Sequence, residues 1–512
     1  MTVNGTVSAD ATIGTYCPGS GGSVLVCCRT LSGSGSISAI ASKTAVTGST
    51  NCGGSGRIAV HYNPSAQSNT VCTVSFNAIG GIGSNLGYKD VGVVNTEDDD
   101  FGDYEEGIRV HLPGTIWFSD NQFLLHSEAY RTAGYPFKGT WRSGEPLNGI
   151  HWTGDRTLNG TRLYFDRANF PFTIDGNLTL TGLGNYGRMI FGLIFTNSQV
   201  TVNGNLTLTD SRMQLTGGKL TVTGNIETSY GAAQKFAGGE IALFAMPTNA
   251  PGQFGVEAEI GGTLHLSNYS VLAPFCEPHN GAVAHVSAKN VTVDAGGKID
   301  ADTKGYDSTY GPGAYRAGGT SSYGGAYGGQ GGLGNNKGVE ANRTQPYGDP
   351  QHPVYPGSGS SYSLGFNARG GGLVYMDVAR NFLLNGLITA DGNRYNVGFY
   401  GWQSGSSGGG VYIRARNFSG SGTIRARGGF PSASATTGDA YPAAGGGGRV
   451  AIWSHNAAQL ADFAANQIDV SSGHFANNVN KVFVEDPSAT GGAGAGTIYL
   501  GFLPAGMRII VK

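Results

Sequence analysis

The chain is poor in charge. Asp, Glu, Lys and Arg together make up 13% of its 512 residues, and the formal net charge is −2. Such a balance gives no strong field for attracting nucleic acid or an anionic membrane surface. Long apolar runs are also missing, since no stretch approaches the roughly 18 residues that a membrane-spanning helix needs. We therefore expect neither a nucleic-acid partner nor membrane insertion.

A secretion signal is not visible either. The opening segment MTVNGTVSAD has no basic start and no apolar stretch of the signal-peptide type. We expect that a signal has been removed and the chain renumbered, or that the chain is a piece of a longer protein.

Glycine, by contrast, is abundant, with 88 residues. It does not recur at every third position, which excludes a collagen helix. The hydrophobic fraction of 39% is enough for a long core, and the low charge argues against a charge-swollen disordered chain. We expect nearly all of the glycines to serve tight turns, where a positive φ angle causes no Cβ clash.

One sequence module occurs twice in the chain, at residues 2–125 and at residues 383–512. VNGTVSAD from Val3 aligns with LNGLITAD from Leu384, and GGSGRIAVH aligns further on with GGGGRVAIW. The period is 384 − 3 = 381 residues, so the chain holds one full period and the beginning of a second. A piece of a repetitive array or a self-assembling subunit would show this organisation.

Short strand-like runs follow one another along almost the whole chain. Val, Ile, Leu, Thr, Tyr and Phe alternate with polar residues, and the runs end at Gly, Asn or Asp. GNLTLT begins at Gly176 and again at Gly204, 204 − 176 = 28 residues later, and GNIETS follows at Gly224. Short strands that recur at variable spacing are typical of a parallel β-solenoid, whose coils bury their inner faces by stacking.

The predicted fold is therefore all-β, a parallel β-helix or β-solenoid with glycine-rich loops; a β-sandwich is the alternative. With about 25 residues a turn and about 4.8 Å between turns, the chain would form a rod on the order of 100 Å long. We expect an N-terminal module at 1–81, an acidic insert at 82–113, central coils at 114–304, a Gly/Tyr/Pro-rich loop region at 305–369 and a C-terminal module at 370–512.

The Gly/Tyr/Pro-rich region 305–369 is too long for an ordinary connection. Its tyrosines are Tyr306, Tyr310, Tyr315, Tyr323, Tyr327, Tyr347, Tyr355 and Tyr362. Because aromatic area is worth burying, we expect an ordered loop that packs on the rod or on a neighbouring subunit. A flexible linker is the alternative.

The C-terminal motifs resemble a known family. After the Gly/Tyr run come GGGLVYMDVARNFLLNGLITADG from Gly370, GSSGGGVYIRARNFSGSGTIRARGG, GGGGRVAIW and GAGTIYL. This succession resembles the glycine-rich β-strand-repeat regions of large secreted, adhesin-like microbial surface proteins, over about residues 1–80 and 300–512. The resemblance implies an extracellular, non-enzymatic scaffold, and it carries over no catalytic residue.

Five of the six cysteines lie near the start of the chain, at Cys17, Cys27, Cys28, Cys52 and Cys72. The second copy of the module has no cysteine at the matching positions, so the fold does not need them. Cys28 matches Ala415 and is expected to face inward, which turns Cys27 outward on the same strand. Two interpretations stay open: disulfides in an oxidising compartment, or small buried hydrophobic residues.

The densest acidic cluster is NTEDDDFGDYEEG, inside the insert. Its candidate calcium ligands are Asp98, Asp99, Asp100 and Asp103. The spacing matches no EF-hand, and a solvated acidic loop is the alternative. No pair of carboxylates stands out as a glycosidase acid and base, and the histidines form no metal-binding motif. We expect no cofactor besides this candidate calcium.

We expect an extracellular structural protein, not an enzyme. Its subunits would self-associate by end-to-end or lateral contacts into a homopolymer that forms a filament, sheath or surface layer. The first copy of the module has no strand before VNGTVSAD, and the second stops soon after GTIYL, so both ends of the solenoid would offer open strands. The candidate assembly contacts are Val3, Val7, Ile509 and Ile510.

Two alternatives remain. A surface adhesin or glycan-binding β-helix would stay monomeric and use exposed aromatic residues, although core filling is at least as good an explanation for Trp117 and Trp453. The tryptophans are Trp117, Trp141, Trp152, Trp402 and Trp453. A β-helical polysaccharide-degrading enzyme or a phage-type spike would need a groove with converging carboxylates and would usually form a trimer.

Overall fold

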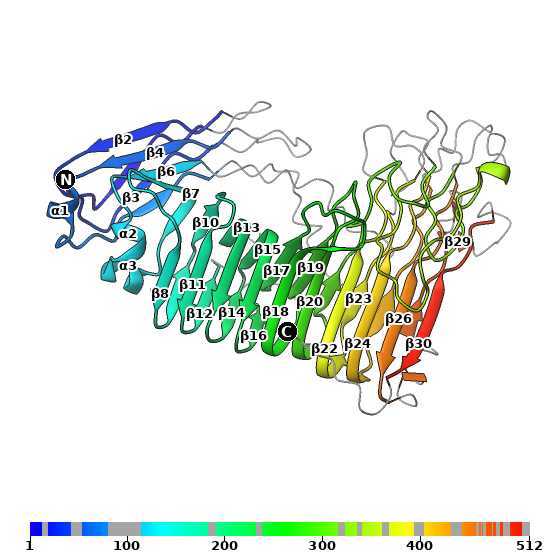
Figure 1. Ribbon diagram of the computed structural model, residues 1–512. Coiled ribbons are helices and arrows are strands. Elements are labelled where there is room, and N and C mark those ends of the chain that lie inside the picture. The colour runs from blue at the N-terminus through cyan, green and yellow to red at the C-terminus, as the bar shows by residue number, and fades with distance from the viewer. Residues whose placement is uncertain are drawn as a thin grey trace.

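The chain winds as a parallel β-helix (Figure 1). The computed structural model describes residues 1–12, 19–41, 54–79, 114–182, 191–231, 238–315, 323–334, 340–360, 368–393, 404–431, 443–456, 460–461, 463, 467–473, 475–477, 482–484 and 492–503. In this part of the chain the named strands pair in parallel, except for an antiparallel pair of β28 (Phe475–Asn477) and β29 (Val482–Val484). The predicted all-β solenoid is confirmed.

Face A is the longest of three faces and runs through the whole molecule. It consists of β1 (Thr6–Ser8), β3 (Ser36–Ser38), β5 (Ser75–Asn77), β7 (Phe137–Ser143), β10 (Arg162–Phe165), the first halves of β13 (Gly192–Val202) and β15 (Arg212–Val222), β17 (Glu240–Phe244), β19 (Val271–Phe275), β21 (Lys298–Asp300), β23 (Leu387–Thr389), β25 (Thr423–Arg425) and β27 (Ile468–Asp469). Each strand pairs in parallel with the next.

The stack is shorter than the sequence predicts. Twelve pairings join the strands of face A, and at about 4.8 Å each they make a rod of about 60 Å. The expected length on the order of 100 Å is wrong because the turns vary in length. One turn takes 222 − 202 = 20 residues from Val202 to Val222, whereas another takes 376 − 286 = 90 from Val286 to Met376.

Faces B and C complete each turn. Face B contains β8 (Ile150–Thr153), β11 (Pro171–Asp175), the second halves of β13 and β15, the first parts of β18 (Phe254–Leu266), β20 (Val283–Val293), β22 (Leu373–Leu384) and β24 (Gly410–Ser419), then β26 (Arg449–Ser454) and β30 (Thr497–Phe502). Face C contains β9 (Arg156–Asn159), β12 (Leu178–Thr181), β14 (Leu206–Thr209), β16 (Ile226–Ser229) and the last parts of β18, β20, β22 and β24.

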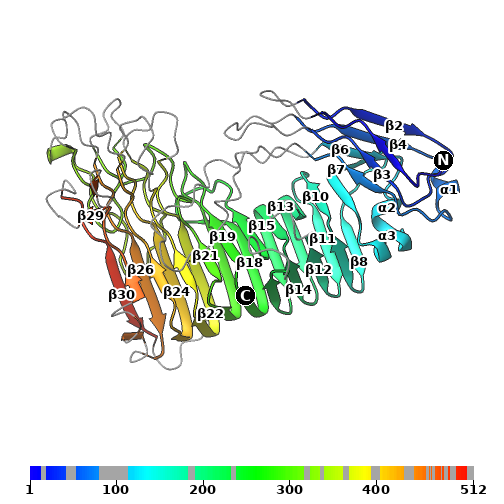
Figure 2. The same ribbon diagram turned by 180° about the vertical axis from the view of Figure 1, so that it is seen from behind.

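The first turns carry a separate second sheet, here called the N-terminal sheet. It consists of β2 (Ser23–Cys27), β4 (Arg57–His61), β6 (Thr115–Phe118) and the end of β7. Short helices α1 (Pro64–Gln67), α2 (Gln122–Leu125) and α3 (Glu128–Ala133) stand in the connections. This sheet is turned away from the axis of the later turns, while face A continues across the bend (Figures 1 and 2). No helix among the described residues is long and apolar enough to cross a membrane.

Strand alternation fills the interior of the rod. On face C one inward column runs through Leu178, Leu206, Ile226, Leu264 and Val291, each paired in register with the next and each fully buried. Burying one such aliphatic side chain stabilises the fold by about 1.5–3 kcal/mol. The stacked columns form one continuous hydrophobic core from the first turns to the last.

The repeated module occupies equivalent places at the two ends of the rod. In the first copy β1, β3 and β5 belong to face A, with β2, β4 and β6 paired beside one another. In the second copy β23, β25 and β27 belong to face A, with β24, β26 and β30 paired in the same order. The sequence alignment therefore corresponds to the same order of strands at both ends.

Glycine-rich segments form a second, side-chain-poor core, here called the glycine bundle, which comprises residues 323–332, 356–360, 404–409 and 443–448. The backbones bond to one another directly: Gly446 N–H donates to the Gly325 carbonyl at 2.9 Å, and Gly408 N–H to the Gly446 carbonyl at 3.0 Å. None of these glycines has a positive φ angle. The expectation of tight turns is wrong here, because these glycines allow close approach of extended backbones.

The loop region 305–369 packs on the rod through buried tyrosines, as predicted. Tyr306 and Tyr327 are buried, and the Tyr327 ring lies 4.8 Å from the Tyr347 ring, centroid to centroid. Arg449 fixes the loop, since its Nε and Nη2 donate to the Tyr347 carbonyl at 3.0 and 2.8 Å. Tyr362 lies outside the described residues.

Candidate functional site

The C-terminal end of face B is an open edge. Among the described residues, β30 pairs only with β26. The inward column Val374, Val411 and Val450 is at most 1% exposed, but Ile498, which follows in register on β30, is 43% exposed. Phe502, on the same strand, is 55% exposed. The hydrophobic interior of the rod is therefore uncovered at this end.

The N-terminal end has an open edge of the same kind. In the described part of the chain, β2 pairs only with β4. Ile116 and Ile58 are buried in one inward column, and Val24, the next residue in register, is only half-buried. Leu25 points outward on β2 and is 67% exposed. Each end of the rod thus shows an unpaired strand with accessible apolar side chains.

The assembly residues chosen from the sequence do not lie on the open strands β2 and β30, since Val7 belongs to β1 and Val3 precedes it. Val3 is 4% exposed and belongs to the core, and Val7 is partly buried against that core. The N–H and the carbonyl of Val3 are also hydrogen-bonded within the chain, to Ser32 and Gly35, so Val3 offers a neighbouring chain neither its side chain nor its backbone. Ile509 and Ile510 lie outside the described residues. The sequence did not single out Ile498, because its strand has the same pattern as the buried strands before it.

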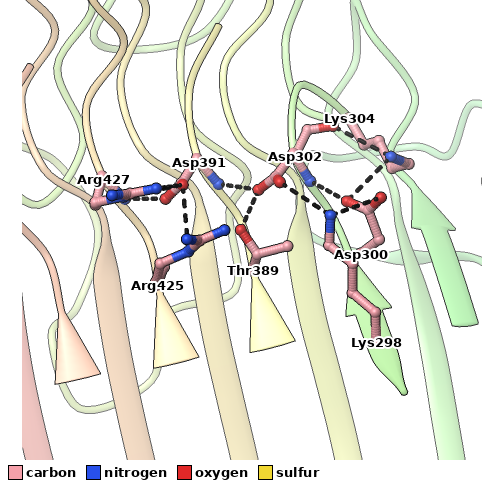
Figure 3. Close-up of polar contacts among 8 residues, drawn as sticks. All are labelled: Lys298, Asp300, Asp302, Lys304, Thr389, Asp391, Arg425 and Arg427. Carbon is pink, nitrogen blue, oxygen red and sulfur yellow. Dashed lines mark hydrogen bonds and ion pairs between the residues drawn. The ribbon is translucent and has the colours of Figure 1, made fainter. Parts of the chain in front are cut away.

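A buried charge network crosses the ends of β21, β23 and β25 on face A (Figure 3). Its members are Lys298, Asp300, Asp302, Lys304, Thr389, Asp391, Arg425 and Arg427. The nitrogens of Lys298 and Lys304 lie 3.3 Å from the two carboxylate oxygens of Asp300. Although burial opposes it, these two cations hold the pKa of Asp300 well below its usual range.

Asp391 holds the other half of the network. Its carboxylate accepts hydrogen bonds from Arg427 Nε and Nη2 at 3.1 and 2.9 Å, and Arg425 Nε lies 3.8 Å away. Asp302 joins the halves, because its Oδ1 accepts from the Asp391 N–H at 2.6 Å and from the Thr389 hydroxyl. Three successive turns of the rod are tied together in this way.

The network is electrically balanced. Four cations face three carboxylates in Figure 3, and Asp469, 3.7 Å from Arg427 Nε, is the fourth acid. Burial raises the pKa of Asp302, and nearby Asp391 and Asp300 raise it further. A glycosidase needs an acid and a base that face a bound sugar. Here every carboxylate holds a cation or a backbone N–H, an arrangement that suits a structural tie between turns.

A second charge contact crosses face C at His265. Its Nδ1 lies 2.7 Å from Glu227 Oε2 and its Nε2 lies 2.8 Å from Asp294 Oδ2. Partial burial opposes the charged form, but the hydrogen bonds to Asp294 and Glu227 outweigh it and raise the pKa of His265. The bridging imidazole links three successive turns.

The structure does not test the predicted calcium site, which remains a prediction. Asp98, Asp99, Asp100 and Asp103 lie outside the described residues. Within the part of the chain that the structure describes, no group of three or more His, Cys, Asp or Glu side chains is placed to hold a metal ion.

The described cysteines are free thiols. Cys27 is exposed and Cys28 is partly buried against the core, as the alignment predicts. Cys72 is buried beside Tyr130, with Sγ 3.4 Å from the phenolic oxygen, and burial raises the pKa of its thiol. No disulfide joins these three, while Cys17 and Cys52 lie outside the described residues.

The tryptophans divide into two kinds. Trp141 and Trp152 are buried in the core, whereas Trp117 and Trp453 are half-buried on the outward side of their strands. Core filling is therefore wrong for the last two. Trp453 Nε1 donates to the carbonyl of Gln351 at 3.0 Å, which fastens the loop region to face B. Trp402 lies outside the described residues.

The charge network was missed from the sequence, although a signal for it exists. IDADTKG from Ile299, ITADGNR from Ile388 and IRARGGF from Ile424 carry their charges at matching offsets. Stacking these segments in register places acids next to bases. Comparisons of the chain with protein-family models, curated proteins and solved structures find no match.

Proposed function

We propose that the protein is an extracellular, non-enzymatic structural subunit whose β-solenoids stack end to end into a filament, sheath or surface layer. One observation carries the proposal: the inward column of face B reaches β30 and is uncovered there, with Ile498 43% exposed. A side chain that is buried at every earlier turn is accessible at the last one because no described strand follows.

The opposite end of the rod also has an unpaired strand with apolar inward residues. β2 has an unpaired edge, a half-buried inward Val24 and a buried Val26. If β2 of one chain paired with β30 of the next, Val24 and Val26 would continue the column of Ile498 and Leu500. Open strands template pairing with another chain, and a head-to-tail contact between two different ends propagates instead of closing.

The charge network supports the non-enzymatic part of the proposal. Its carboxylates hold cations and backbone N–H groups between turns, and Asp300 and Asp391 are 7% and 3% exposed. A rod whose turns are tied together by buried charges in this way suits a load-bearing subunit. The extracellular location rests on the resemblance of the glycine-rich motifs to secreted surface proteins.

A glycan-binding adhesin is the second candidate, favoured by one group of side chains on face B. Phe254, which is 40% exposed, stacks on His285 at 4.3 Å and meets Tyr375 edge-on at 5.0 Å between ring centroids. Aromatic faces of this kind can stack on sugar rings. An adhesin would remain a single rod in solution and would bind a polysaccharide through this group.

Negative-stain electron microscopy of the purified chain decides between the two. We expect regular filaments or tubes from the wild type and single rods of about 60 Å from Ile498→Glu, which charges the open end. Leu383→Glu is the matched control, since Leu383 is 36% exposed on β22, away from both ends. Single rods from concentrated wild-type protein would contradict the assembly. Loss of filaments on reduction would assign a cysteine to the contact.

A further inference from the structure

The outward side of face A carries three cations in one column. Lys138 on β7 pairs in register with Arg162 on β10, Arg162 pairs with Gly192 on β13, and Gly192 pairs with Arg212 on β15. Arg162 and Arg212 are therefore two strands apart, about 9.6 Å between Cα atoms. Gly192 stands between them in register and has no side chain.

The arginines point away from the core, yet Arg212 is buried and Arg162 is half-buried. Leu163 and Met213, the next residues on the two strands, are fully buried in the core, so strand alternation turns Arg162 and Arg212 outward. The Nε atoms of both arginines are nevertheless buried without a hydrogen-bond partner. A buried guanidinium nitrogen without an acceptor destabilises the folded state.

The column is also short of negative charge. Its one carboxylate among the described residues is Glu240, next in register after Arg212, and the Arg212 Nε–Glu240 Oε2 distance is 3.7 Å. Segments 183–190 and 232–237, which precede β13 and β17 in the sequence, contain no Asp or Glu. Burial lowers the pKa of Arg162 to about 10, and the nearby charge of Arg212 contributes.

Lys138 is the third cation of the column and pairs with Arg162 on the side away from Arg212. Its Nζ lies 5.2 Å from the centroid of the Phe191 ring, and desolvation by burial lowers its pKa. Like charges held together in a partly buried place destabilise the fold unless an opposite charge compensates them. The described acids supply one negative charge for three cations. A doubly charged anion would balance the two positive charges that remain.

We propose that Lys138, Arg162 and Arg212 bind a small oxyanion, of the sulfate or phosphate class, on the outward side of face A. Guanidinium groups present planar pairs of N–H donors that match the oxygens of such an anion, and Lys adds a point charge. The Nε atoms of both arginines are buried, which favours a small ligand. The bound anion would tie β7, β10 and β15 together, a role independent of assembly.

Thermal unfolding and isothermal titration calorimetry of the full chain test the site. Sodium sulfate, sodium phosphate and sodium acetate are titrated at constant ionic strength set with sodium chloride. We expect a saturable rise in Tm of several degrees with sulfate or phosphate, and a heat of binding for one anion per chain. Acetate, which carries one charge, is expected to bind at least tenfold more weakly.

Two variants and a control make the result specific. Arg162→Met should remain folded and lose the saturable rise, and Arg162→Lys, which keeps the charge but loses the planar fork, should weaken binding at least tenfold. Arg131→Met removes an exposed arginine of α3 and should respond as the wild type does. An equal sulfate response in the wild type and Arg162→Met, or no heat of binding in the wild type, would overturn the proposal.

Discussion

The side-chain oxygen of Asn177 accepts the backbone N–H of Asn205, one turn later, at 2.8 Å, and the Asn205 Nδ2 donates to the same oxygen at 3.1 Å. The same contact recurs at 2.8 Å from Asp155 to Asn177 and from Asn205 to Asn225. These residues stand at the corner before face C, where GNLTLT and GNIETS begin. The recurring Gly-Asn pair is therefore the sequence trace of an asparagine ladder.

Asn205→Ala should destabilise the rod by about 1 kcal/mol, the value of one hydrogen bond. The substitution removes the acceptor of the Asn225 N–H and one donor to Asn177. Gln199→Ala, an exposed position on β13, is the control and should leave stability unchanged. Urea unfolding followed by circular dichroism measures both. Equal urea midpoints for Asn205→Ala and Gln199→Ala would show that water replaces the hydrogen bonds of the ladder without loss of stability.

Gly445→Ala should disrupt the glycine bundle. A Cβ atom at Gly445 would lie 1.8 Å from the Ser406 carbonyl oxygen, which cannot move without its own backbone. We expect a loss of about 1–3 kcal/mol, as for other overpacked interiors, and faster proteolysis in the loop region around Tyr327. Gly5→Ala is the matched control, because nothing lies within 4 Å of its added Cβ. Similar proteolysis rates for the two would contradict close packing of the bundle.

The sequence predicted the stacking of neighbouring turns, but neither the charge network between three of them nor the contacts between distant segments. Alternation and the Gly-Asn repeats revealed the solenoid because each turn contacts only the next. The packing of the loop region on the rod depends on contacts such as that of Arg449 with Tyr347, which lie 449 − 347 = 102 residues apart and follow no period. Ile498 shows the same limit, since its exposure depends on the strand that would follow and not on its own pattern.

His265 should stabilise the fold at low pH. Its pKa is raised in the folded protein, so its contribution is complete below the unfolded value of about 6.5 and disappears as the pH rises through the folded pKa. His265→Gln should therefore cost up to about 1 kcal/mol at pH 5, a limit set by partial exposure, and little at pH 9. Tm measured across this range gives the difference.

The matched histidine variant is His126→Gln, at an exposed residue without a carboxylate partner among the described residues. Its Tm difference from the wild type at pH 5 and at pH 9 is the reference for a histidine without such partners. A constant cost of His265→Gln over the same range would mean that the imidazole acts by packing and not through charged hydrogen bonds to Glu227 and Asp294.

Asp391 and Asp10 hold the same position in the two copies of the module and provide a controlled comparison. Asp10 is exposed and accepts the Ile40 N–H at 2.7 Å and the Ser38 hydroxyl at 2.8 Å. Asp391 accepts the Arg427 N–H at 2.6 Å, in the same ladder geometry, but it also neutralises buried guanidinium groups.

Asp391→Ala should therefore cost about 3–5 kcal/mol, because Arg425 and Arg427 lose their shared carboxylate. Asp10→Ala should cost only about 1 kcal/mol, since it removes hydrogen bonds at an exposed corner. Chemical unfolding of the two variants measures the difference between the copies. If a second change, Arg427→Met, restores stability to Asp391→Ala, the loss comes from the uncompensated charge of Arg427. Equal costs for Asp391→Ala and Asp10→Ala would assign both to the ladder and leave the buried network without a role in stability.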